Sequence, residues 1–261
     1  MQATKIEQAA QILLSHWRAQ RCIEALPESC RPATREEGYA IQDALVAQSR
    51  QSVFGWKIAA TSAAGQKHIG VDGPFAGALL AARLHRNGAT VPLGNSLMCV
   101  AEAEFAFRLG RDLPPRAAAY TQEEVMAAVD ALYPAIELPD SRYADFARAG
   151  APQLIADSAC ANYFVLGEPV NSDWRALDLS KHAVKAYVDG QLVQEGSGAN
   201  VLGDPRIALT WVANELAGNG RNLRAGQIVT TGTSTVPAKI KIGSRVRADF
   251  GAFGQVETTL S

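Results

Sequence analysis

The run of ten residues from 100 to 109 constrains the fold of this chain more than any other stretch. Its sequence, VAEAEFAFRL, puts Glu102 and Glu104 in one alternating set of positions and Phe105 and Phe107 in the other. This period of two predicts a β-strand, because successive side chains on a strand point to opposite faces. The two glutamates then share a face, with Cα atoms about 6–7 Å apart, and their carboxylates look into one volume.

A third carboxylate, Glu137, lies in the apolar run 131–139, with no charged neighbour for several residues on its N-terminal side. A buried carboxylate must be protonated, paired or bound to a cation. Carboxylates gathered in one volume predict a divalent cation, and an all-oxygen ligand set favours Mg²⁺ or Mn²⁺ over Zn²⁺. The alternative interpretation is that Glu102 and Glu104 form the solvent-facing side of an amphipathic strand.

The composition excludes several classes of protein. The 261 residues are 48% hydrophobic and 20% charged, which is typical of a globular chain with a sizeable core. A net charge of −1, without a basic cluster, argues against nucleic acid or an anionic membrane as partner, so we expect a small ligand. No signal-peptide pattern and no apolar run near the ~20 residues of a membrane span are present. We therefore expect a cytoplasmic protein, whose four scattered cysteines are reduced and mostly buried.

The first 52 residues are predicted to be helical. A capping-box pattern at Thr4 begins a helix from about residue 5 to 20, and Thr34 begins a second helix that runs to about residue 50. A strand follows at 54–59, in which Lys57 interrupts an apolar run. A lysine in that setting either extends its ammonium to solvent or meets an anion.

The middle of the chain is harder to interpret. The segment 61–92 is rich in Gly, Ala and Pro and is predicted to form loops beside a site. Thr121 is expected to cap a third helix, with Val125, Val129 and Leu132 on one face, which leads to Glu137.

The last third of the chain favours a barrel or rolled sheet over a parallel α/β sheet. A hairpin with an Asp189-Gly190 turn and a helix from Asp204 to Gly218 are expected. Short strands are predicted at 227–231, 238–242, 244–250 and 255–259.

Two groups of small polar residues could belong to a site. Asp157 and Ser158 lie between apolar residues, where they either line a pocket or satisfy local backbone groups. Gly232 and Thr233 form a tight turn whose backbone amides could face a ligand oxyanion.

Six motifs in a fixed order carry a family resemblance. They are Gly55-Trp-Lys-Ile, Glu102-Ala-Glu, Ile136-Glu-Leu-Pro-Asp, Ile155-Ala-Asp, Val201-Leu-Gly-Asp-Pro and Thr230-Thr-Gly-Thr. From about residue 35 to the end, the chain resembles the fumarylacetoacetate hydrolase superfamily, and within it the 2-keto-4-pentenoate hydratase and 4-oxalocrotonate decarboxylase branch. The resemblance implies an α+β fold: a mixed β-sheet roll at 53–261, preceded by a small helical N-terminal region at 1–52. It also implies homo-oligomers.

The resemblance assigns roles to individual residues. It implies Mg²⁺ or Mn²⁺ held by Glu102, Glu104 and Glu137. It implies catalysis by Lys57, Asp157 and Ser158. It implies substrate contacts from Phe75, Leu138 and Thr233.

The implied activity is that of a metal-dependent hydro-lyase. Its substrate is a small 2-oxo or 2-hydroxy-dienoic acid, and water adds to a 2-hydroxy-2,4-dienoate to give a 4-hydroxy-2-oxo acid. Lys57 would move a proton or hold the carboxylate. Three alternatives stay open: decarboxylation of a 2-oxo-3-enedioate, tautomerisation of an oxaloacetate-type acid, and a non-catalytic subunit that stabilises a partner enzyme of the same pathway.

The chain departs from the hydratase pattern in two places. Where hydratases carry an Asp after a proline, this chain has Phe75 after Pro74, which removes a polar group expected in the pocket. Where they read Asp-Asn-Ala-Ser, this chain reads Asp157-Ser-Ala-Cys160. The His-Glu pair of hydrolytic members has no counterpart here, which argues against C–C bond hydrolysis.

Overall fold

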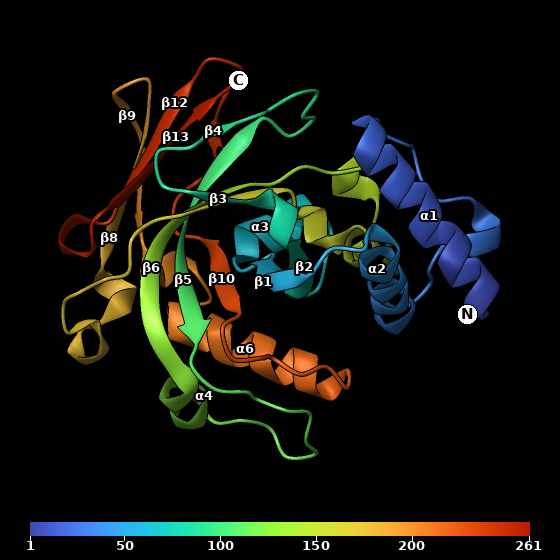
Figure 1. The fold of residues 1–261 in the computed structure, drawn as a ribbon, viewed down its shortest axis with the longest axis horizontal. Helices are drawn as coiled ribbons and strands as arrows, with labels where there is room; N and C mark the ends of the chain where they lie inside the picture. The colour runs from blue at the N-terminus through green and yellow to red at the C-terminus, as the bar shows by residue number, and fades with distance from the viewer.

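Two mixed β-sheets and a set of flanking helices make up the computed structural model, which describes all residues 1–261 (Figure 1). The helices are α1 (Ala3–Ala19), α2 (Arg35–Ser49), α3 (Ala63–His68), α4 (Gln122–Ala128), α5 (Ala151–Ala156) and α6 (Pro205–Gly218). The arrangement confirms the predicted α+β class with mixed sheets.

The larger sheet has eight strands in the order β2-β1-β10-β5-β6-β7-β3, with β11 paired to β5. Its strands are β1 (Val53–Ala59), β2 (Phe75–Leu80), β3 (Leu84–Arg86), β5 (Val100–Leu109), β6 (Val129–Leu138), β7 (Tyr163–Leu166), β10 (Ile228–Thr233) and β11 (Ala238–Lys239). The smaller sheet has the order β4-β13-β12-β8-β9. Its strands are β4 (Thr90–Val91), β8 (Ala183–Val188), β9 (Gln191–Ser197), β12 (Arg245–Asp249) and β13 (Gln255–Leu260).

The long strands β5 and β6 run through the centre of the molecule, between α1 and α2 on one side and the smaller sheet on the other (Figure 1). The alternation in 100–109 correctly predicted β5. The third predicted helix was wrong beyond Ala128: Val129 begins β6, which pairs antiparallel with β5 down to Glu137 opposite Glu102. Pairing with a neighbouring strand thus overrides a helical spacing of apolar residues.

The segment 61–92 is more regular than the predicted loops. It contains α3, the fully buried strand β2 and the short strands β3 and β4. Strand β2 pairs antiparallel with β1, which sets Gly77 opposite Lys57. Its small residues let the backbone lie close to its neighbours, and this packing forms a strand that has no alternating signal.

The N-terminal helices lie close to their predicted ranges. Thr34 caps α2 by accepting a hydrogen bond from the Glu37 N–H, as predicted. The capping box expected at Thr4 was wrong, because α1 begins at Ala3, two residues before the predicted start, and has Gln2 at its N-cap without a side-chain hydrogen bond. Both helices contribute to the same cluster of 58 buried residues as the sheets. The boundary at 52/53 therefore stays a prediction.

The C-terminal third follows most of its sequence signals, but the strand predicted at 238–242 ends at Lys239, and Gly232 and Thr233, predicted as a turn, are the last residues of β10. Asp189 and Gly190 have φ of 52° and 81°, as a type I′ hairpin turn requires, and Asp204 caps α6. All four cysteines are free, but only Cys30 and Cys160 are buried, so the expectation of mostly buried thiols was too strong. No helix is long and apolar enough to cross a membrane.

Candidate active site

Three carboxylates converge at the centre of the larger sheet. Strand β5 presents Glu102 and Glu104 on one face, and the β5–β6 register brings Glu137 opposite Glu102. One oxygen from each residue lies within 4.8 Å of the others. Glu104 and Glu137 are buried, while Glu102 is half-buried and faces a cavity. The sequence-based expectation that these three side chains share one volume agrees with this geometry.

The carboxylate oxygens are only partly satisfied by the protein. Oε2 of Glu104 accepts hydrogen bonds from the Thr230 hydroxyl and from the Gly232 N–H, the latter at 2.8 Å. Oε1 of Glu104 and both oxygens of Glu137 are buried without a hydrogen bond. Buried acceptors gathered in one cluster fit a hard divalent cation, which takes oxygen ligands.

Lys57 is the cation that the protein itself supplies. Its side chain is buried in β1, and its Nζ lies 2.9 Å from Oε1 of Glu137, in an ion pair that lacks hydrogen-bond alignment. Burial alone would lower the pKa of Lys57, but the charges of Glu137 and Glu102 outweigh burial and raise it. The Lys57 ammonium is therefore held in its charged form.

The same surroundings disfavour the charged forms of Glu102 and Glu104. Burial, with the charge of Glu137 added, raises the pKa of Glu102 to about 7. Burial also raises the pKa of Glu104 well above its ordinary value, with Glu137 and Glu102 adding to the effect. In the absence of a metal the site therefore tends to hold protons, which a divalent cation would displace.

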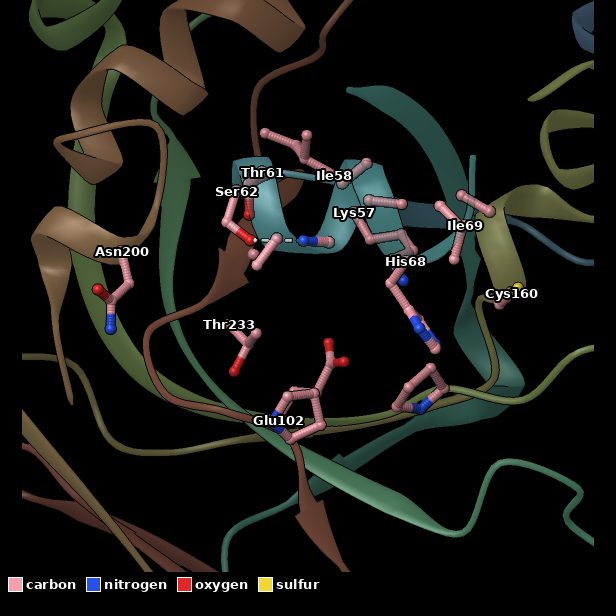
Figure 2. Close-up of a pocket in the computed structure, with 18 of the residues that line it drawn as sticks. Lys57, Ile58, Thr61, Ser62, His68, Ile69, Glu102, Cys160, Asn200 and Thr233 are labelled. Carbon is pink, nitrogen blue, oxygen red and sulfur yellow. Dashed lines mark hydrogen bonds between the residues drawn. The ribbon is translucent and has the colours of Figure 1, made fainter. Parts of the chain in front are cut away.

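A cavity of about 860 Å³ opens beside these groups. Figure 2 shows Glu102 between Thr233 and Asn200 on one side and His68 on the other, with Lys57 of β1 above them in this view. Phe75 and Thr233 both line the cavity, although Phe75 is only 1% exposed and belongs to the main hydrophobic core. Their contact with a substrate stays a prediction.

The other three predicted site residues lie outside the cavity lining. The Asp157 carboxylate is fully buried and accepts hydrogen bonds from the Arg142 Nε and N–H groups and from Ser141. A direct catalytic role does not fit Asp157, because these partners already occupy its oxygens. Leu138 belongs to the hydrophobic core. Packing and pairing, which a single sequence does not display, explain both placements.

Ser158 is buried at the start of a left-handed turn. Ser158, Ala159 and Cys160 have φ of 50°, 55° and 60°, an uncommon run for residues other than glycine. Ser158 itself does not line the cavity, but Ala159 and Cys160 do. The turn therefore places Ala159 and Cys160 in the cavity wall and leaves Ser158 outside it.

Several cavity residues were not predicted from the sequence. Ser62, His68, Asn200 and Thr235 all line the cavity, from loops and short helices that have no periodic signal. Gly232 was predicted to form a turn that faces a ligand, but its N–H donates a hydrogen bond to the Glu104 carboxylate instead. Its φ is 101°, and an added Cβ would lie 2.1 Å from Thr61 Oγ1. Thr230 and Gly232, which both donate to Glu104, belong to the Thr-Thr-Gly-Thr motif of the sequence.

The sheet roll and the carboxylate cluster define a class of protein. The chain belongs to the fumarylacetoacetate hydrolase family, since the family model "Fumarylacetoacetate (FAA) hydrolase C-terminal" matches residues 53–261. Among curated relatives, a 2-keto-4-pentenoate hydratase of Paraburkholderia xenovorans (strain LB400) is 34% identical over 256 residues, covering 97% of this chain and 93% of the relative. A 4-oxalocrotonate decarboxylase of a Pseudomonas species is 31% identical over 230 residues, covering 85% and 86%.

Among solved structures, 4-oxalocrotonate decarboxylase from Pseudomonas putida G7, complexed with magnesium and adipate, superposes with a TM-score of 0.89. That match covers 100% of this chain and 99% of the other, at 23% identity, and it shows the shared fold. The comparisons confirm the family and the branch that the motifs indicated.

Proposed function

We propose that the protein is a divalent-metal-dependent hydro-lyase that adds water to a 2-hydroxy-2,4-dienoate and yields a 4-hydroxy-2-oxo acid. The observation that carries the proposal is the cluster of Glu102, Glu104 and Glu137, with buried oxygens that accept no hydrogen bond, beside Lys57 at the wall of a large cavity. The hydratases among the relatives support the choice of reaction.

When held by Glu102, Glu104 and Glu137, a divalent cation supplies a Lewis acid for the carboxylate and 2-oxygen of such an acid. The reaction is balanced without a redox partner: the 2-hydroxyl loses a proton and carbon 5 gains one, then hydroxyl adds to carbon 4 and a proton to carbon 3. Lys57 is the proton carrier we assign to these steps, because it is the only buried ammonium at the site.

The remaining residues position and enclose the substrate. Thr233 contacts the polar end of the substrate, and Phe75 excludes water from part of the wall. Asp157 acts as a positioning residue: its ion pair with Arg142 holds the turn at 158–160, and Arg142 also donates to the Asp157 and Ala161 carbonyls.

The metal and the assembly are part of the same proposal. An all-oxygen site accepts Mg²⁺ and also Mn²⁺, and we propose that either ion supports activity. The homo-oligomer, the association with a partner enzyme of the same pathway and the cytoplasmic location stay predictions from the sequence.

A second candidate function is decarboxylation of a 2-oxo-3-enedioate. Phe75 lines the cavity where the hydratase pattern has an Asp, so a polar group that could orient water is missing. The decarboxylase among the relatives fits this alternative as well. Oxaloacetate-type tautomerisation needs no positioned water, and its test is the same assay with oxaloacetate as a third substrate.

The test is a spectrophotometric assay of purified protein on 2-hydroxypenta-2,4-dienoate and on 2-oxo-3-hexenedioate, with Mg²⁺, with Mn²⁺ and after chelation, and with NMR identification of products. We expect metal-dependent loss of dienol absorbance with formation of a 4-hydroxy-2-oxo acid. Release of CO₂ without hydration would favour the decarboxylase. A protein that binds Mn²⁺ but leaves every substrate unchanged would indicate the non-catalytic subunit.

A further inference from the structure

Beyond the three clustered carboxylates and Lys57, the cavity wall is almost free of charged side chains. Of its 29 lining residues, 16 are hydrophobic, and no arginine or aspartate is among them. Lys57 already faces Glu137 at 2.9 Å. His68 is thus the only other lining side chain that can become cationic, and its ring packs edge-on against Phe146, with centroids 6.2 Å apart.

The two sides of the cavity differ in character. Figure 2 places Asn200 and Thr233 on one side of Glu102, and His68 and Ile69 on the other. The ring contact with His68 puts Phe146 on the side of Ile69. We call Ile69 and Phe146 the apolar wall; both are half-buried and packed against the main hydrophobic core.

The cavity is also larger than the smallest substrate needs. Its volume of about 860 Å³ lies in the upper part of the ~300–1,000 Å³ range of small-molecule sites, which enclose drug-sized ligands. A five-carbon dienoate bound through a cation at the carboxylate cluster would leave much of this space, including the apolar wall, in contact with water. Burial of apolar substrate surface there is favourable, at about fourfold in affinity for each CH₂.

We infer that the cavity selects a substrate whose distal end is a neutral, apolar group, and that it disfavours a second carboxylate. This inference rests on the proposed function, since the head group must bind at the carboxylate cluster for its tail to reach the apolar wall. A distal carboxylate would lose its hydration there and find no permanent cation in exchange.

The test measures binding apart from turnover. Affinities of the Mg²⁺-loaded protein are determined by calorimetry for three 2-oxo acids that cannot be hydrated: pyruvate, 2-oxooctanoate and 2-oxoadipate. We expect 2-oxooctanoate to bind at least about tenfold more tightly than pyruvate and than 2-oxoadipate. Equal or tighter binding of 2-oxoadipate would overturn the inference.

Substitutions in the apolar wall test whether this wall causes the preference for an apolar tail. Phe146→Arg supplies a cation, so it should shift the affinity ratio toward 2-oxoadipate by about tenfold while pyruvate binding stays unchanged. Arg148→Ala, in the same turn and with an exposed side chain outside the cavity, is the control and should leave all three affinities unchanged. Ile69→Ala, which should weaken only 2-oxooctanoate binding, serves if Phe146→Arg does not fold.

Turnover is then measured on alkyl-substituted and unsubstituted dienols. Selective binding of 2-oxooctanoate without hydration of any dienol would refute the proposed function and support the tail preference. Hydration of dienols with no preference among the three 2-oxo acids would support the proposed function and refute the tail preference.

Discussion

Lys57 combines burial, charge and a carboxylate neighbour in one position. Its substitution Lys57→Met keeps an unbranched chain of similar length but removes the ammonium 2.9 Å from Glu137. We expect kcat to fall by about 10²–10⁴-fold, the usual effect of losing a general acid or base. Mg²⁺ affinity, measured by calorimetry, should be retained or raised, because a competing cation is lost. Turnover within about twofold of the unaltered enzyme would make Lys57 a structural residue.

Substitution of Glu104 tests the proposed metal site. Glu104→Gln keeps the shape that accepts hydrogen bonds from Thr230 and Gly232 but removes one of three negative charges. We expect Mg²⁺ binding to weaken and activity to be lost, while the melting temperature of the metal-free protein is unchanged or raised, because repulsion among buried carboxylates is relieved. Asp130→Asn, an exposed carboxylate on β6, is the control. Full activity of the unaltered protein after exhaustive chelation would contradict the metal assignment.

Substitution of Phe75 would distinguish the two candidate reactions. A phenyl ring at the cavity wall excludes water and lowers the local dielectric constant, which strengthens charge interactions without helping to orient a water nucleophile. Phe75→Asp should therefore raise the ratio of hydration to decarboxylation, measured by NMR on the two substrates. Phe75→Asn, without a buried charge, is the companion variant if the first unfolds. Fast, clean hydration by the unaltered protein would show that Phe75 is harmless to that reaction.

At the scale of elements, the sequence predicted the helices, strands and turns that depend on interactions between residues close together in the chain. The alternating strand β5, the capped helix α2 and the Asp189-Gly190 hairpin were all predicted, because each depends on spacing or turn chemistry. Strand β6 and strand β2 were missed. Both are stabilised by pairing with a distant neighbour, and β2 is buried on both faces, so its sequence has no alternation to detect.

The contact between β2 and the left-handed turn at 158–160 gives a prediction at this scale. A Cβ added at Gly77 would lie 2.0 Å from the Ser158 carbonyl oxygen and 2.8 Å from Ala159 Cβ. Gly77→Ala should therefore lower the free energy of unfolding by about 1–3 kcal/mol, because backbone has to move. Gly73→Ala meets nothing nearer than 3.9 Å and should be nearly neutral. Thermal denaturation of both variants is the measurement; equal melting temperatures would mean that the turn yields freely.

At the scale of the whole molecule, the cluster of three carboxylates was predictable and the cavity was not. Glu102 and Glu104 are linked by one strand, and Glu137 stood out as a lone charge in an apolar run. The cavity, in contrast, takes its walls from α3, the 3₁₀ turn at 146–148 and the loop at 199–203, which only the folded chain brings together. Asp157 shows the same limit, since its partner Arg142 became visible only in the structure.

Metal binding and pH should act together on the stability of the whole protein. The folded-state pKa of Glu102 is raised from 4.5 to about 7, chiefly by burial, so the folded metal-free protein binds this proton more tightly than the unfolded chain does. The resulting stabilisation is complete below the unfolded pKa and is lost as the pH rises through about 7. Without metal, the melting temperature should therefore fall between pH 5 and pH 8.

Mg²⁺ should reverse that loss where the carboxylates are ionised. We expect a larger Mg²⁺-induced rise in melting temperature at pH 8 than at pH 5, because protons compete with the cation for the same oxygens. Glu102→Gln should flatten the pH dependence in chelator, while Asp130→Asn should keep it. The measurement is differential scanning fluorimetry at both pH values, with chelator and with Mg²⁺. An equal rise at pH 5 and pH 8 would mean that the metal binds elsewhere than at the three buried carboxylates.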